Sequence, residues 1–252
     1  MSFRYVFQEY INHPEQHQDI IVFEDVNVLI IKDSFPKALR HYLVIPKSPA
    51  ITNVHPLDVF NRDYSDYTGE ELYDLISQYV ERAKKMVAED LGKVLECEPS
   101  KVAEIKNTRI KVGIHSIPSL KNLHIHVITT DFHLSSMKNK KHYNSFNTKF
   151  FVEFEELNPE FNEQYLRAYN QNYDSDSADS EDGDDGHSQE FIRHVRNETT
   201  LHDIIKETPL KCLQCGEKFD FKFQRLKLHL ETEVTEYYGS FGVDISTLSQ
   251  EK

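Results

Sequence analysis

Three histidines stand close together in the segment VGIHSIPSLKNLHIHVI, which runs from Val112 to Ile128. Side chains alternate between the two faces of a β-strand, so a strand here places His124 and His126 on one face and apolar residues on the other. His115 follows another expected strand and precedes a turn at Pro118 and Ser119, which folds it back toward the same face. Spacing alone also fits a half-solvated strand with incidental histidines, or two ligands of a metal site. The segment therefore predicts one face for chemistry and one for the core.

A second group of candidate ligands lies near the C-terminus, in the pattern C-x2-C-x13-H-x3-E formed by Cys212, Cys215, His229 and Glu233. On a helix the last two lie one turn apart on the same face, and two thiolates, an imidazole and a carboxylate complete a tetrahedral zinc shell. Because the fourth ligand departs from the common finger pattern of two cysteines and two histidines, Glu231 and Glu236 are alternatives, as is an unligated CxxC pair. A tail this small would struggle to fold without metal, so the pattern predicts structural Zn2+.

The elements that must position these residues are a sheet and its helices. Residues 20–31 predict two short strands with a turn at Glu24 and Asp25, and an extended run resumes over 41–45. From Thr68 a helix is expected, because Thr68 and Glu71 fit a capping box and apolar residues follow at helical spacing, with Gly92 able to close it. Residues 3–11 also have helical spacing. The fold class is therefore α+β, with an antiparallel sheet, flanking helices and a small C-terminal metal-binding domain.

Composition and charge limit the classes of protein further. The chain has 252 residues, 38% of them hydrophobic, with three cysteines and a net charge of −13. Three cysteines form no disulfide framework, which favours a reducing compartment. No secretory signal or membrane-spanning run is apparent, so we expect a soluble intracellular protein without a membrane partner.

An acidic run divides the chain. Seven acidic residues and no base lie between Asp174 and Asp185, interleaved with serine and glycine. Such a segment cannot bury apolar surface and should be a disordered linker. We therefore expect a sheet domain over residues 1–170, an acidic linker over 171–190 and a finger domain over 191–252. The linker is also a candidate phosphorylation target and a docking segment for other proteins.

Several blocks together resemble one family. GIHSIPSLKNLHIHVI, MKNKKHYNSF and CLQCGEKFDFKFQRLKLHLETE follow one another in this order, and SFRYVFQEYINHPE and KDSFPKALRHYLVIP precede them. In this combination they resemble the aprataxin family in its fungal form, which comprises DNA 5′-adenylate hydrolases of the histidine-triad superfamily. The resemblance covers nearly the whole chain except the acidic run and the last dozen or so residues.

The resemblance implies a role for individual residues. His124 matches the nucleophile, His126 the third triad histidine, His115 the histidine that assists the leaving group, and His41 a further phosphate-contacting histidine. Asn122 stands where the triad has its first histidine, so this chain lacks the imidazole that makes a polar contact there in other members. The nucleotide-binding and phosphate-binding positions fall on Asp33, Lys37, Ser119 and Lys141, and the DNA-contacting positions on Phe3, Lys141 and Tyr143. The basic residues Lys222 and Arg225 of the finger are further candidates for contacts with DNA phosphates.

The family implies removal of AMP from 5′-adenylated DNA ends or nicks, left by aborted ligation, through a covalent His-AMP intermediate and without a catalytic metal. The expected partners are such DNA ends, AMP as product and repair proteins bound through the linker; the expected state is a monomer, in the nucleus and also the cytoplasm. Two other interpretations remain: a general histidine-triad hydrolase of dinucleoside polyphosphates or AMP-lysine, and a non-catalytic DNA-end binding module.

Overall fold

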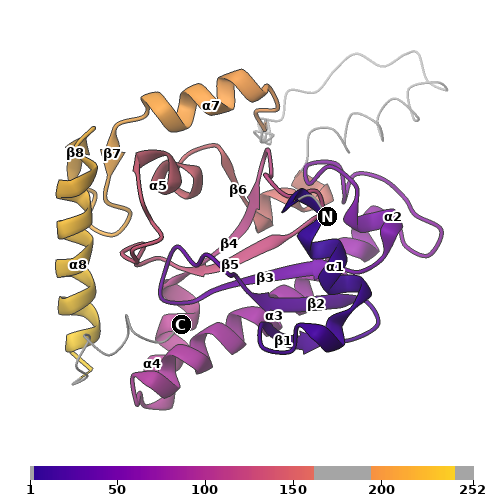
Figure 1. Cartoon of the computed structure of the whole chain (residues 1–252), viewed down its shortest axis with the longest axis horizontal. Coiled ribbons are helices and arrows are strands. Elements are labelled where there is room, and N and C mark those ends of the chain that lie inside the picture. Colours follow the sequence, from indigo (N-terminus) through magenta and orange to yellow (C-terminus); the bar gives the residue numbers. More distant parts are fainter. Residues whose placement is uncertain (1–2, 162–193, 242–252) are drawn as a thin grey trace, which may run out of the picture.

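The computed structural model describes residues 3–161 and 194–241, with the side chain of Phe3 excepted. At the centre of the described part lies a six-stranded antiparallel sheet in the order β1-β2-β3-β5-β4-β6 (Figure 1). Its strands are β1 (Ile21–Glu24), β2 (Val28–Lys32), β3 (His41–Pro46), β4 (Ile110–His115), β5 (Ile125–Thr129) and β6 (Phe151–Glu153). The α+β class and the expected strands are therefore confirmed.

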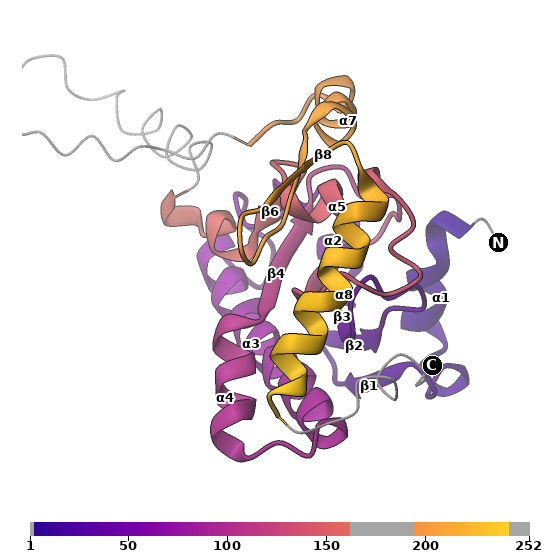
Figure 2. The same ribbon diagram turned by 90° about the vertical axis from the view of Figure 1, so that its left-hand side faces the viewer.

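Helices cover both faces of this sheet, as Figures 1 and 2 show. The helical elements of this part are η1 (Phe3–Tyr5), α1 (Val6–Asn12), η2 (Pro14–Gln16), α2 (Pro49–Thr52), α3 (Gly69–Val94), α4 (Pro99–Thr108), α5 (Lys140–Asn147), η3 (Phe154–Leu157) and η4 (Pro159–Phe161). Alternate residues of β2 separate the two layers: Val28 and Ile30 pack in the core that includes α3, whereas Leu29 and Ile31 pack against α1. The period-2 alternation of a strand thus sends its two faces into different cores.

Helix α3 begins as the sequence predicts but does not end where it predicts. Thr68 accepts a hydrogen bond from the Glu71 backbone and the Glu71 carboxylate reaches back, which completes the capping box. The expectation that Gly92 closes the helix is wrong, because α3 continues to Val94. A Cβ atom at Gly92 would lie 2.6 Å from Cγ2 of Val102, so the glycine instead allows α4 to pack closely.

The C-terminal part, which we call the finger (residues 198–241), contains α7 (Glu198–Glu207), β7 (Leu210–Lys211), β8 (Lys218–Asp220) and α8 (Phe223–Gly239). Its apolar residues share one core with the sheet domain: Leu210, Phe219, Leu226 and Leu230 pack together with Phe132, Tyr143, Phe146 and others. The finger is therefore built onto the sheet domain. The acidic run and both linker boundaries fall outside the described residues, so the division at 170 and 190 stays a prediction.

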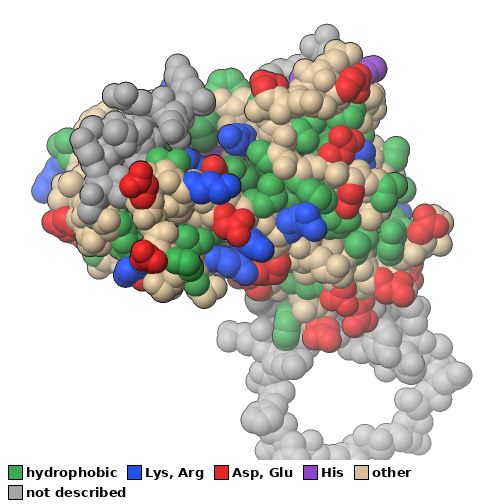
Figure 3. All heavy atoms as spheres, turned by 90° about the horizontal axis from the view of Figure 1, so that it is seen from below, with side chains coloured by type: hydrophobic (Ala, Val, Ile, Leu, Met, Phe, Trp, Pro, Cys, Tyr) green, Lys and Arg blue, Asp and Glu red, His purple; other side chains and the backbone are tan. Residues whose placement is uncertain are grey.

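The face seen from below carries interspersed charges of both signs (Figure 3). Ion pairs lie within α4 and join α3 to α4, such as Lys101 with Glu104 at 2.8 Å and Lys106 with Glu81 at 2.9 Å. A mixed surface gives no extended field of one sign. Among the helices that the structure describes, none is long and apolar enough to span a bilayer.

Candidate active site and metal centre

The four candidate histidines come from three neighbouring strands and converge on one pocket. His41 begins β3, His115 ends β4, and His124 and His126 flank the first residue of β5. The ring centroids of His124 and His126 lie 5.0 Å apart, and that of His115 lies 4.6 Å from His126. All four line a cavity of about 370 Å³, a size suited to a nucleotide. The predicted split is confirmed, since Leu123, Ile125 and Val127 face the core.

A backbone carbonyl fixes the tautomer of His124. The Nδ1 atom of His124 lies 2.8 Å from the carbonyl oxygen of Asn122. Because a carbonyl only accepts hydrogen bonds, Nδ1 must carry the proton. The lone pair of the neutral ring is then on Nε2, which suits His124 for nucleophilic attack.

His41 and His126 form a hydrogen-bonded pair beneath the pocket. His41 Nε2 lies 2.9 Å from His126 Nδ1, and His41 Nδ1 lies 3.4 Å from the Lys37 amide and 3.3 Å from Asp33 Oδ2. If the Lys37 amide donates to His41, then His41 donates to His126 and the free proton of His126 is on Nε2. If His41 donates to Asp33 instead, His126 Nε2 becomes an acceptor. A phosphate oxygen accepts hydrogen bonds, so phosphate binding selects the first arrangement.

Burial keeps these imidazoles neutral. Desolvation lowers the pKa of His41 to about 4 and that of His115 to about 3, and it also lowers the pKa values of His124 and, by more, His126. A neutral His124 is the nucleophilic form. The histidine expected to assist the leaving group, His115, is thus in its neutral form in the free protein. Its Nε2 atom and that of His126 are buried without a hydrogen-bond partner among the described residues, which is a cost that a phosphate ligand would relieve.

Aromatic side chains from two helices form apolar walls of the pocket, and sequence reasoning did not assign them. Phe7 of α1 packs edge-on against His124, with ring centroids 5.0 Å apart. Phe146 of α5 contacts three histidine rings, at 4.8 Å from His115, 5.4 Å from His126 and 5.8 Å from His41. His142 and Ser145 of α5 also line the pocket. The block MKNKKHYNSF was the one available signal for α5, but it did not indicate which face points inward.

The remaining predicted residues divide between the pocket, the surface and the core. Asp33, Lys37 and Ser119 line the pocket, whereas Lys141 is exposed and is not among the lining residues. The expectation that Tyr143 contacts DNA is wrong: its side chain is 0% exposed. Its hydroxyl instead donates to the Lys211 carbonyl at 3.0 Å and accepts from the Leu213 amide at 3.1 Å. The side chain of Phe3 lies outside the described residues.

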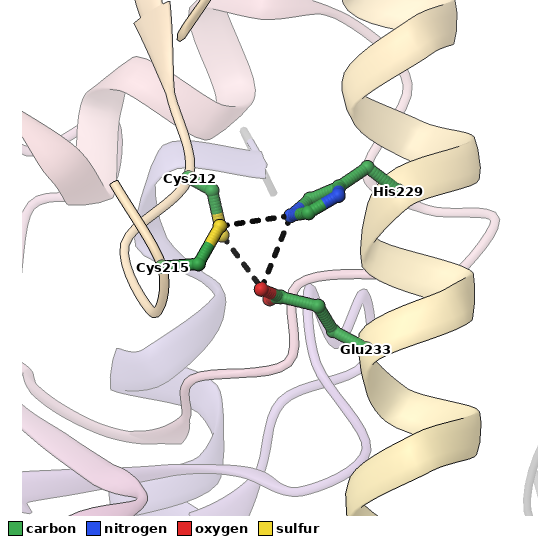
Figure 4. A group of neighbouring side chains, drawn as sticks. All are labelled: Cys212, Cys215, His229 and Glu233. Carbon is green, nitrogen blue, oxygen red and sulfur yellow. Dashed lines mark hydrogen bonds and ion pairs between the residues drawn. The ribbon is translucent and has the colours of Figure 1, made fainter. Parts of the chain in front are cut away.

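The predicted metal ligands come together in the finger (Figure 4). Cys212 and Cys215 lie on the loop after β7, and His229 and Glu233 lie one turn apart on α8. Cys215 Sγ is 3.2 Å from His229 Nε2, Cys212 Sγ is 3.1 Å from Glu233 Oε2, and His229 Nε2 is 3.1 Å from Glu233 Oε1. Four such atoms within 4.8 Å of one another fit a tetrahedral zinc shell.

Local structure supports this ligand set. The Gln214 and Glu217 amides point at the two sulfur atoms, at 3.4 Å and 3.5 Å, and Gly216 makes the tight turn with φ of +79°. Glu217 Oε2 lies 3.4 Å from His229 Nδ1, so this carboxylate orients the imidazole. The alternatives Glu231 and Glu236 are exposed and outside the cluster. Lys222 and Arg225 lie exposed at the start of α8.

Two protein-family matches cover most of the chain. Residues 4–142 match the family described as "Scavenger mRNA decapping enzyme C-term binding". Residues 147–236 match the C2HE / C2H2 / C2HC zinc-binding finger, which agrees with the cluster of two cysteines, one histidine and one glutamate. The second match begins within α5, consistent with a finger that shares its core with the sheet domain.

Other proteins match this chain over nearly its whole length. An aprataxin-like protein of Saccharomyces cerevisiae is 32% identical over 249 residues, which cover 94% of this chain and 99% of the relative. The structure is similar to that of the aprataxin ortholog Hnt3 in complex with DNA, with a TM-score of 0.66, 27% identity and coverage of 95% and 96% of the two chains. Hnt3 in complex with DNA and guanosine matches with a TM-score of 0.64 and 27% identity, covering 95% and 97%.

Proposed function

Because this chain belongs to the aprataxin family, we propose that it repairs DNA by removing AMP from 5′-adenylated ends, and that His124 performs the chemistry. The tautomer of His124 carries this assignment: its Nδ1 proton is held by the Asn122 carbonyl, so the Nε2 lone pair is available in the pocket. The match to Hnt3 bound to DNA and guanosine supports a pocket that accepts a nucleoside beside a DNA end.

The first step is nucleophilic attack on the AMP phosphorus. The Nε2 lone pair of His124 forms a P–N bond, and the bond between that phosphorus and the bridging pyrophosphate oxygen breaks. The electron pair leaves with the DNA 5′-phosphate, and the enzyme holds His124-AMP. Since the pKa of His124 is lowered by burial, no proton must be removed from Nε2 before attack.

Neighbouring groups stabilise the negative charge that grows on the phosphoryl oxygens. His126 donates through Nε2 when His41 donates to its Nδ1, and one well-placed donor of this kind is typically worth about 3 kcal/mol of barrier. Burial keeps His115 neutral in the free protein, so its N–H can donate a hydrogen bond to the departing 5′-phosphate, and the negative charge of that phosphate raises the pKa of the ring. The expected contacts of Lys37, Ser119 and Asp33 with phosphate and ribose belong to this proposal.

Water completes the reaction. It attacks the phosphorus of His124-AMP, the P–N bond breaks and its electron pair returns to Nε2. AMP leaves with the water oxygen, the two water protons pass to the AMP phosphate and to solvent, and the DNA keeps the 5′-phosphate released in the first step.

The finger supplies structure and DNA contacts. Cys212, Cys215, His229 and Glu233 hold Zn2+ in a structural role, and no catalytic metal takes part. Lys222 and Arg225 meet phosphates without reading sequence, which makes the affinity salt-dependent. We assign the protein to the nucleus and expect it to act as a monomer on DNA, with the acidic segment open to repair proteins.

The test is AMP release from adenylated nicked DNA by wild type, His124→Ala and the control His202→Gln. His202 is an exposed histidine on α7 outside the pocket, so its variant should match wild type. Wild type should release AMP and pass through an acid-labile protein-AMP adduct, whereas His124→Ala should do neither. Equal activity of wild type and His124→Ala would refute the assignment.

Substrate comparison separates the other interpretations. A general nucleotide hydrolase would turn over diadenosine polyphosphates at least as well as adenylated DNA, and its DNA activity would not respond to charge reversal at Lys222 and Arg225. A binding module would bind AMP stoichiometrically without turnover. Charge reversal is preferable to removal of the finger, because that removal would expose the core shared with Phe132 and Phe146.

A further inference from the structure

Asn122 occupies the position where the triad pattern has a histidine, and its side chain is 1% exposed. Its Nδ2 lies 3.3 Å from Gln8 Oε1 of α1 and 3.3 Å from Thr52 Oγ1 of α2. Its own backbone carbonyl accepts a hydrogen bond from His124 Nδ1. One residue thus contacts two helices and the nucleophile.

The amide suits this position because it has two hydrogens to donate. A neutral imidazole has one N–H and one acceptor nitrogen, so it could donate to only one of these two oxygens. The orientation of Gln8 agrees with donation by Asn122: the Gln8 Nε2 atom already donates to Asn12 Oδ1 at 2.9 Å, so its Oε1 faces Asn122 as an acceptor. The amide also stays uncharged at every pH, so it brings no titrating group to the pocket.

Backbone hydrogen bonds attach the same segment to α2 and to η1, the short helix that leads directly into α1. The Lys121 amide donates to the Arg4 carbonyl at 2.9 Å, and the Leu123 amide donates to the Thr52 carbonyl at 2.6 Å. Phe7 of α1 packs against the ring of His124. Residues 121–124 are therefore held from both sides, with the Asn122 amide as the side-chain link between α1, α2 and the carbonyl that orients His124.

We propose that Asn122 is a positioning residue that couples the seating of α1 to the alignment of His124, so that the nucleophile is correctly oriented only when the N-terminal helix is in place. The inference rests on the proposed function, because it concerns how His124 reaches phosphorus. When the Gln8 contact is lost, the peptide carrying the Asn122 carbonyl is held less firmly. His124 then spends less time in the productive orientation.

The variants act on Gln8, which is half-buried and does not line the pocket. Gln8→Leu removes the acceptor that faces Asn122, and Gln8→Glu keeps an acceptor there. Asn12→Ala is the matched control, because it removes the other hydrogen bond of Gln8 and leaves the Asn122 contact intact. Thermal unfolding of each variant checks that all of them are folded.

The substrate must separate alignment from DNA binding, so each variant is assayed on adenosine 5′-(p-nitrophenyl phosphate) as well as on adenylated nicked DNA. The first substrate has no DNA for α1 to contact. Gln8→Leu should lower kcat about fivefold on both substrates, the effect of one lost neutral hydrogen bond, with KM for the p-nitrophenyl ester unchanged. Gln8→Glu and Asn12→Ala should stay near wild type.

A double-mutant cycle between Gln8→Leu and Asn122→Ala completes the test. If the two residues act through one link, the double variant should be no slower than Asn122→Ala alone. Additive losses would overturn the proposal, and so would a Gln8→Leu variant that is impaired only on DNA or a Gln8→Glu variant as slow as Gln8→Leu. These results are independent of whether His124→Ala abolishes AMP release, which tests the function itself.

Discussion

Lowering the pH from 8 to 5 should destabilise this protein through its buried histidines. Burial holds the pKa of His41 at about 4, below its ordinary value of 6.5. Between these two values the unfolded chain binds a proton at this position and the folded protein does not. Stability is therefore complete above pH 6.5 and falls as the pH drops from 6.5 toward 4.

The size of the effect follows from the two pKa values. For His41 alone, a pKa of 6.5 in the unfolded chain and of about 4 in the folded protein corresponds to a loss of about 2 kcal/mol in the free energy of unfolding at pH 5. His115, His124 and His126 shift in the same direction and add to the loss. The loss is a large fraction of the 5–15 kcal/mol that is roughly typical of folded domains.

Urea unfolding at pH 8 and pH 5 measures this loss in wild type and in His41→Gln, which has no titrating group at this position. The variant should lose about 2 kcal/mol less than wild type over this range. Both proteins contain the same cluster of metal ligands in the finger, so protonation of those ligands cancels in the comparison. Equal losses in the two proteins would refute the reasoning, because they would mean that His41 has the same pKa folded and unfolded.

Three further outcomes are expected. Tyr143→Phe removes the hydroxyl that bonds to Lys211 and Leu213, so it should lower the midpoint of thermal unfolding by about 5 °C and speed zinc release to a chelator. An unchanged midpoint would contradict the role of Tyr143 in holding the cysteine loop. Cys212→Ser should reduce the zinc content found by elemental analysis, and full zinc occupancy would argue against the ligand set. Arg225→Glu should weaken binding to nicked DNA and reduce the slope of log K against log salt by about 0.9 or more, whereas an unchanged slope would remove Arg225 from the DNA surface.

Local patterns were enough to predict much of this fold. The alternation in Leu123 to Val127 predicts which side chains face the core, since a strand has a period of two wherever it lies. The capping box at Thr68 depends on residues three positions apart and needs no tertiary information. The spacing from Cys212 to Glu233 also predicts the metal cluster. Each pair of ligands is close in sequence, one on a tight loop and one on a single helical turn, so local structure sets its geometry.

Other expectations failed where distant segments meet. Gly92 has the residue type of a helix end, but α4 packs on it and the helix continues. Tyr143 belongs to a lysine-rich block typical of a nucleic-acid surface, yet it is buried between α5 and the cysteine loop. Which face of a short helix is buried depends on the segment that packs against it. The residues of MKNKKHYNSF alone do not indicate that the finger packs against α5.

By itself the sequence determined the identity of the chemistry: a histidine-bearing strand, a finger with four ligands, and the family whose blocks they share. Only the tertiary structure decided how that chemistry is set up. The carbonyl of Asn122 orients His124, the bond between His41 and His126 leaves Nε2 of His126 as its free nitrogen, and Phe7 and Phe146 pack against rings whose burial lowers their pKa values. These properties arise from contacts between residues far apart in the chain, because tautomer and pKa depend on the neighbours of a ring and not on its position in a motif.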